Sequence, residues 1–230
     1  MGYSQAQQIA LAIAPKVGGA VSIFGSLWIF LEILGSREKQ QQVYHRIMFM
    51  ISTFDIMVSA GAFASTWPMT PATDPWKGRG TETTCTIQGF AMQLGGTLFT
   101  YNAALSIFYV LLITFKVNEI IIKKYEWAIH APPLLFGLTT ASVAAGMGWY
   151  HNANLWCWIA VDPDCLDEDF ALENVSHCDR YQHIWIYRWA LFFAPLWLCL
   201  VIQVSWPRKW LGCLLWALFS LSSSSLPLSV

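Results

Sequence analysis

Charged side chains are scarce in this sequence. Asp, Glu, Lys and Arg make up 12% of its 230 residues, against about 25% in an ordinary soluble domain. The deficit is uneven, because long stretches carry no charge, and hydrophobic residues reach 56%. With a net charge of −1 and no basic stripe to neutralise phosphates, we expect no nucleic-acid partner. The uncharged stretches are the segments that a lipid bilayer would accept.

Catalytic motifs are also missing. The chain has no nucleophile elbow, no HExxH and no P-loop, and its five histidines show no metal-ligand spacing within a helix. We therefore expect no enzyme, no metal and no cofactor. The polar pairs repeated in two halves that are typical of many transporters are absent as well, but a transporter or channel stays an alternative.

Five apolar segments are long enough to cross about 30 Å of hydrocarbon, which takes about 20 residues. Their apolar runs are continuous rather than alternating, which predicts helices and not strands. The predicted fold class is an all-α membrane protein, a bundle of about five transmembrane helices over residues 1–206, followed by a short atypical tail, 207–230. The helices are expected at about 9–34, 47–67, 85–115, 127–149 and 183–206.

Basic residues predict the orientation of this bundle. Eight fall in the first and third connections or after the fifth helix: Arg37, Lys39, Arg46, Lys116, Lys123, Lys124, Arg208 and Lys209. The other side has Lys77, Arg79 and Arg180. Because cytoplasmic loops carry the excess of Lys and Arg, the N-terminus is predicted to be extracellular. We expect a multi-pass protein of the plasma membrane.

The predicted outer loop, residues 150–182, has two features of an extracellular segment. Asn174-Val175-Ser176 is an N-glycosylation sequon, and four cysteines lie on this oxidising side of the bilayer: Cys85, Cys157, Cys165 and Cys178. Four cysteines allow three connectivities. We favour Cys85 with Cys157 and Cys165 with Cys178, and the other two connectivities stay open.

Half of the chain's 14 acidic residues lie in the same loop. A solvated loop explains them, with calcium binding or an electrostatic ligand funnel as alternatives. The spacing of the carboxylates does not match an EF-hand.

Asp55 is a carboxylate within a predicted span, where a charge is costly and usually faces the bundle interior. At 1.5 Å per residue, Ser106 falls at the same depth and Asn102 one turn higher. We predict a polar cluster of Asp55, Asn102 and Ser106, a hydration or sodium-like site, with a structural hydrogen-bonded Asp as the alternative. Arg188 and Trp158 are a candidate ligand mouth, unless Arg188 simply reaches the headgroups.

Small residues recur four apart in three of the helices, which predicts close helix packing in lipid. The three stripes are Gly18, Ser22 and Ser26; Gly96, Thr100 and Ala104; Gly137, Ala141 and Ala145.

Several motifs carry a resemblance to a known family. Thr84-Cys85-Thr86-Ile87-Gln88-Gly89 opens the third helix, and Leu155-Trp156-Cys157-Trp158-Ile159 follows the fourth, just after Gly148-Trp149-Tyr150. Ser52–Ile56 and Tyr101–Tyr109 add patterns in helices two and three. From about residue 44 to 206, the chain resembles seven-helix G-protein-coupled receptors. It is most similar to the slime-mould cyclic-AMP-receptor-like group and the related secretin-like (family 2) receptors.

The resemblance implies a cell-surface receptor that senses an extracellular small-molecule or peptide ligand and activates a heterotrimeric G protein through its inner loops. It also implies the Cys85–Cys157 disulfide. The short N-terminus favours the cyclic-AMP-receptor-like group, in which the ligand enters the bundle.

The tail departs from this family. After Lys209 only residues 210–220 are apolar, about half a span, so helices six and seven are not expected. The tail is interpreted as an incomplete gene model, and the alternative is a truncated receptor product that does not couple to a G protein. A structural membrane protein is a further alternative, and it predicts an even number of helices with both termini inside.

Overall fold

Five helical segments of the chain are long and apolar enough to cross a membrane, which indicates a multi-pass membrane protein. The computed structural model describes residues 4–71, 77–166 and 175–204, so the predicted tail and Asn174 lie outside the described residues. The five segments are Gln5–Leu34, Val43–Ala64, Glu82–Thr114, Trp127–Gly146 and Ile184–Val204. The predicted helical class is thereby confirmed.

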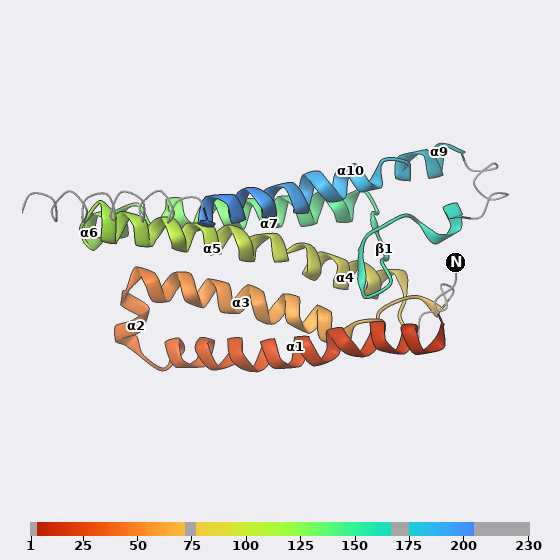
Figure 1. Ribbon diagram of the computed structural model, residues 1–230, viewed down its shortest axis with the longest axis horizontal. Coiled ribbons are helices and arrows are strands. Elements are labelled where there is room, and N and C mark those ends of the chain that lie inside the picture. Colours follow the sequence, from red (N-terminus) through yellow and green to blue (C-terminus); the bar gives the residue numbers. More distant parts are fainter. Residues whose placement is uncertain (1–3, 72–76, 167–174, 205–230) are drawn as a thin grey trace, which may run out of the picture.

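The spans run back and forth along one long axis (Figure 1). The first two are α1 (Gln5–Leu34) and α3 (Val43–Ala64), joined by the short α2 (Arg37–Gln41). The third span is divided into α4 (Glu82–Gln93), α5 (Gly95–Tyr109) and the π-helical turn η2 (Val110–Thr114). The fourth is α7 (Trp127–Gly146), preceded by the short α6 (Glu119–Lys124). The fifth begins with α10 (Ile184–Arg188) and the π-helical turn η5 (Trp189–Phe193).

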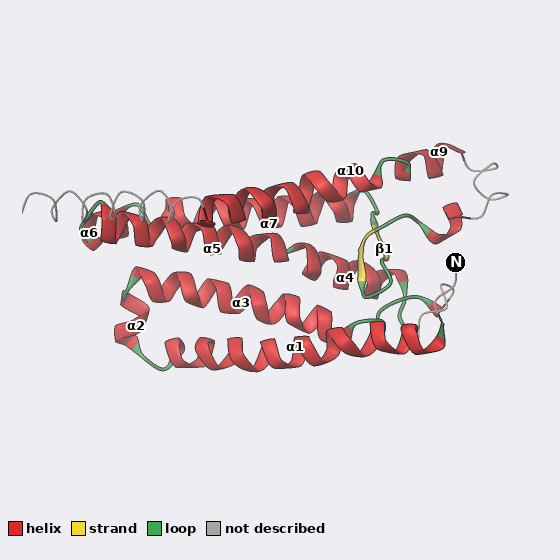
Figure 2. Cartoon of the chain, viewed as in Figure 1, coloured by secondary structure: helices red, strands yellow, loops and turns green. Residues whose placement is uncertain are grey.

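One small sheet interrupts the helical architecture (Figure 2). β1 (Tyr150–Asn152) and β2 (Cys157–Ile159) pair antiparallel, with His151 opposite Trp158. Short helical turns follow: η3 (Pro163–Leu166), α9 (Val175–Cys178) and η4 (Asp179–Tyr181).

The two ends of the bundle differ in what they carry (Figure 1). The hairpin end holds β1, β2, α4 and the start of α1. The α6 end, at the opposite extreme of the molecule, holds α2 and α6. The two names are used in this sense below.

Helix starts at the hairpin end follow from local sequence. Ser4 and Gln7 form a reciprocal capping box before α1, and Thr81 and Thr84 form another before α4. Each box gives partners to backbone N–H groups that the first helical turn leaves unpaired. The third span consequently begins at Glu82, three residues earlier than predicted.

Close packing of α1 on α3 depends on Gly19 rather than on Gly18. A Cβ added at Gly19 would lie 2.7 Å from both Phe63 N and Ser59 O, whereas one at Gly18 would meet nothing within 4 Å. The first small-residue stripe is therefore Gly19, Ser22 and Ser26. The prediction of Gly18 was wrong because spacings of three and four share one helix face equally well.

A buried apolar core joins the second, third and fourth spans, and large hydrophobic side chains cover much of their outside, as expected of surfaces that face lipid. The buried members of this core are Val43, Ile47, Phe54, Leu94, Tyr101, Phe108, Ile122 and Ala141.

Candidate functional site

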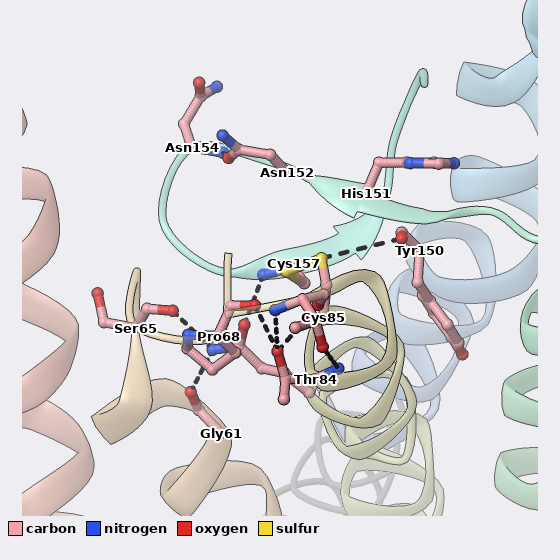
Figure 3. The surroundings of a disulfide bond; sticks show 12 residues. Gly61, Ser65, Pro68, Thr84, Cys85, Tyr150, His151, Asn152, Asn154 and Cys157 are labelled. Atoms are coloured by element: carbon pink, nitrogen blue, oxygen red, sulfur yellow. Dashed lines mark hydrogen bonds between the residues drawn. A yellow bond between two sulfur atoms is a disulfide. The ribbon is translucent and has the colours of Figure 1, made fainter. Parts of the chain in front are cut away.

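Two disulfides stabilise the hairpin end. Cys85, in the first turn of α4, is bonded to Cys157 at the start of β2, and both side chains are buried (Figure 3). Cys165 is bonded to Cys178 within the loop that follows the hairpin. These are the two favoured pairs. The first fastens the hairpin to the third span.

The side-chain amide of Gln88 reinforces the same junction. Its Nε2 donates to the carbonyls of Gly61 (2.8 Å) and Ser65 (2.7 Å), and its Oε1 accepts from the N–H of Cys157 (2.9 Å). One buried side chain thus joins α4 to the end of α3 and to β2. Gln88 was not predicted to have this role from the sequence, although a Gln within an apolar span is itself a signal.

Arg188 and Trp158, the predicted ligand mouth, do lie together. The guanidinium carbon is 5.3 Å from the Trp158 ring centroid, and Nη2 donates to the carbonyl of Ile159. A cation over an indole face is attracted by the ring quadrupole. The Nε of Arg188 is buried and has no hydrogen-bond partner among the described residues.

Gln93, at the end of α4, joins Trp158 of the hairpin to the fifth span. Its Oε1 accepts from Trp158 Nε1 (2.8 Å), and its Nε2 donates to the carbonyl of Leu191 (3.3 Å). Pro195 lacks the N–H that would otherwise bond to Leu191 four residues earlier. Gln93, which is fully buried, supplies a side-chain donor to this carbonyl. Sequence reasoning missed this residue.

Tyr150 is buried under the hairpin, where its hydroxyl donates to the carbonyl of Ala141 (3.0 Å). Burial raises the pKa of this hydroxyl well above its ordinary value, because the charged form loses solvation. The side chain is therefore a neutral donor that fixes the hairpin to α7.

The predicted cluster of Asp55, Asn102 and Ser106 is not formed, and this is a correction. Asp55 Oδ2 accepts instead from the hydroxyls of Ser22 (2.6 Å) and Ser26 (2.5 Å) on α1. Asn102 and Ser106 donate to carbonyls of their own helix, Leu98 (2.8 Å) and Asn102 (3.0 Å). Equal depth did not decide the contact, because the close approach of α1 at Gly19 brings both serines to Asp55.

A second polar network, which sequence reasoning missed, lies toward the α6 end. Arg46 donates through Nε and Nη2 to the two carboxylate oxygens of Glu126. Its Nη1 bonds to the carbonyls of Gln40 (3.1 Å) and Gln41 (3.3 Å) at the end of α2. Arg46 therefore joins the first connection to the start of the fourth span, 80 residues along the chain.

His130 extends this network into the bundle. Its Nε2 lies 3.3 Å from Glu126 Oε1, and its Nδ1 lies 3.0 Å from the hydroxyl of buried Tyr101. An ionised carboxylate only accepts, so in the neutral imidazole we assign the proton to Nε2, and Tyr101 donates to Nδ1. The only local signal was the four-residue spacing of Glu126 and His130.

The described residues contain no group of three or more His, Cys, Asp or Glu side chains that could hold a metal ion.

Comparison with known proteins adds no relative: no family model, no curated protein and no solved structure matches this chain. What can be stated is the class, a helical multi-pass membrane protein with a disulfide-bonded hairpin at one end.

Proposed function

We propose that the chain is a cell-surface receptor, similar to the cyclic-AMP-receptor-like group of G-protein-coupled receptors, with the hairpin end outside the cell. It senses an extracellular ligand at the hairpin end and signals to a heterotrimeric G protein at the α6 end. The observation that carries the proposal is the Cys85–Cys157 disulfide, which holds the hairpin against the mouth of the bundle.

Three further observations support this proposal. Disulfides persist on the oxidising side of a membrane, and both of the disulfides described lie at the hairpin end. The basic residues of the first and third connections lie at the opposite end, as cytoplasmic loops require. The unpartnered Nε of Arg188 beside Trp158 gives the outer mouth a cationic donor.

Signalling can be tested with the full chain in vesicles that also hold a panel of purified G-protein heterotrimers. The measurement is uptake of a non-hydrolysable GTP analogue, with and without cyclic AMP as the probe ligand. We expect faster uptake for at least one heterotrimer than in vesicles without the chain. If no heterotrimer responds although the Cys85–Cys157 bond is formed, signalling through G proteins is refuted.

Orientation is tested separately through Asn174, in a eukaryotic host. We expect the full chain to carry a glycan that an endoglycosidase removes, and Asn174→Gln to lose it. A glycan-free chain that labels at Lys123 with an impermeant amine reagent on intact cells would place the α6 end outside and overturn the proposed orientation.

A further inference from the structure

The loop between the third and fourth spans has an exposed apolar and basic surface. We call it the α6 surface, and it consists of Phe115, Lys116, Ile120, Ile121, Lys123 and Lys124. The short helix α6 begins after Asn118, whose side chain accepts from the N–H of Ile120 (2.9 Å). Ile122 is buried in the core shared by the spans, and this contact fixes which side of α6 is left exposed.

The apolar members of the α6 surface are unusually accessible. Ile120 is 76% exposed, Ile121 53% and Phe115 56%. They lie between Ile113 at the end of one span and Trp127 at the start of the next, both also exposed. Because a span leads into the loop and another leads out, these side chains continue the lipid-facing surface up to the depth of the headgroups.

The lysines of the α6 surface have no acidic partner among the described residues. Lys116, Lys123 and Lys124 are all exposed, whereas two other cations of the same end are paired, Lys39 with Glu32 and Arg46 with Glu126. Three ammonium groups with no carboxylate partner in the described parts of the chain, beside an apolar surface, have the composition of an interfacial anchor; Lys124 Nζ lies 6.0 Å from the centroid of the Tyr125 ring.

The backbone at Lys116 has an unusual conformation for a lysine. Its φ is +51°, in the left-handed region that glycine normally occupies at the end of a helix. A side chain here has a conformational cost, and glycine would remove it. The position nevertheless holds a lysine, at the boundary of the third span.

We propose that the α6 surface binds acidic phospholipid headgroups of the leaflet in which it lies, with its isoleucines in the acyl boundary and its lysines on the phosphates. A soluble anion would explain the lysines but leave the isoleucines in water. An acidic lipid satisfies both, since the headgroup and its chains are one molecule. The binding needs only that the flanking segments span the bilayer, and it is independent of G-protein signalling.

The test uses the purified full chain in neutral detergent and a fluorescent phosphatidylserine, with fluorescent phosphatidylcholine as the reference lipid. We expect phosphatidylserine to bind more tightly. Each substitution Lys116→Gln, Lys123→Gln or Lys124→Gln should lower its apparent affinity about five-fold at low salt. Replacing the same lysines by Arg should preserve the preference, and added salt should weaken it. The matched control is Lys77→Gln with Arg79→Gln at the hairpin end, which should change nothing.

Two results of this titration would overturn the proposal. One is an unchanged preference for phosphatidylserine in the triple Gln variant. The other is equal competition by soluble glycerophosphoserine, which would assign the lysines to a free anion.

A nitroxide at position 120 tests the apolar half of the surface in vesicles containing phosphatidylserine. The variant is Ile120→Cys in a chain that also carries Cys199→Ser and Cys213→Ser. We expect the label to be accessible to oxygen, which dissolves in the bilayer, and shielded from a water-soluble nickel complex. The reverse accessibility would place α6 in water, where it would serve a protein partner, and would refute lipid docking.

Discussion

The hairpin end and the α6 end are both held by polar contacts that join distant parts of the chain, but the contacts differ in kind. At the hairpin end they include the Cys85–Cys157 bond and the buried amide of Gln88, and the charged Arg188 there bonds to a carbonyl rather than to a carboxylate. At the α6 end they are ionic and only half-buried, between Arg46 and Glu126.

This difference separates a fixed end from an adjustable one. Neutral hydrogen bonds and a disulfide do not respond to salt, whereas a partly exposed ion pair is weakened by it. The proposed receptor function would use such a division, because it combines a stable outer mouth with an inner end that can rearrange. The predictions below probe the two ends in order of expected effect.

Removing the Cys85–Cys157 bond should have the largest effect. The double variant Cys85→Ser, Cys157→Ser should lose about 2–5 kcal/mol of unfolding free energy, since the bond closes 72 residues of chain. The measurement is denaturant unfolding in detergent, followed by tryptophan fluorescence. Removing Cys165–Cys178, which closes 13 residues, should have a smaller effect because a shorter loop restrains the unfolded chain less. Equal losses would contradict this ranking.

Gln88→Leu should be the most damaging change of a single neutral side chain. It leaves two carbonyls and the N–H of Cys157 without their partner, for about 3 kcal/mol. Thermal unfolding by size-exclusion chromatography of heated samples measures the loss. The control is Gln182→Leu, an exposed glutamine at the same end, which should change the melting temperature little. An equal fall in melting temperature for both variants would mean that the three hydrogen bonds of Gln88 do not stabilise the junction.

Gly19→Ala should weaken the packing of α1 on α3 by about 1–3 kcal/mol. The added Cβ has backbone atoms of Phe63 and Ser59 within 2.7 Å, and backbone cannot move aside cheaply. Gly18→Ala is the matched control, which we expect to be neutral or slightly stabilising. Unfolding in mixed micelles of increasing SDS fraction distinguishes them. If Gly18→Ala were the harmful change, α1 would pack on α3 through the face that contains Gly18, as the sequence predicted.

At the α6 end, Glu126→Gln should lower the unfolding free energy by about 2 kcal/mol, because the guanidinium of Arg46 and the ring of His130 lose a charged acceptor. The wild-type protein should lose part of its advantage over the variant in high salt, and the hairpin-end variants should not show this salt dependence. Differential scanning calorimetry at two salt concentrations tests both points. Glu119→Gln, on exposed α6, is the control and should be nearly silent.

The smallest effect is expected between the two ends. Ser22→Ala removes one of the two hydroxyls on Asp55, for about 1 kcal/mol. Ser106→Ala removes only a bond to a carbonyl of its own helix and should cost less. Chemical denaturation of the two variants side by side gives the difference. A larger loss of unfolding free energy for Ser106→Ala than for Ser22→Ala would contradict the pairing of Asp55 with the serines of α1.

The sequence by itself determined the spans and limited the disulfide pairing to three connectivities, one of them favoured. Span length follows from a count of apolar residues, because the hydrocarbon core of a typical bilayer is about 30 Å thick. The pairing of Cys85 with Cys157 could be favoured because few cysteines share the oxidising side. These inferences use quantities that are local in the chain or common to all membranes.

The polar contacts inside the bundle were decided only by the tertiary structure. Depth along a helix can be counted, but the direction in which a residue faces depends on the rotation of the helix, and one residue changes it by about 100°. That single step separates Gly18, where an added Cβ would meet nothing within 4 Å, from Gly19, which packs on α3. The rotation of α1 brings Ser22 and Ser26 to Asp55, in place of the predicted Asn102 and Ser106. Arg46 and Glu126 meet across 80 residues for the same reason: packing of the spans sets their rotation, and no local pattern in the sequence records it.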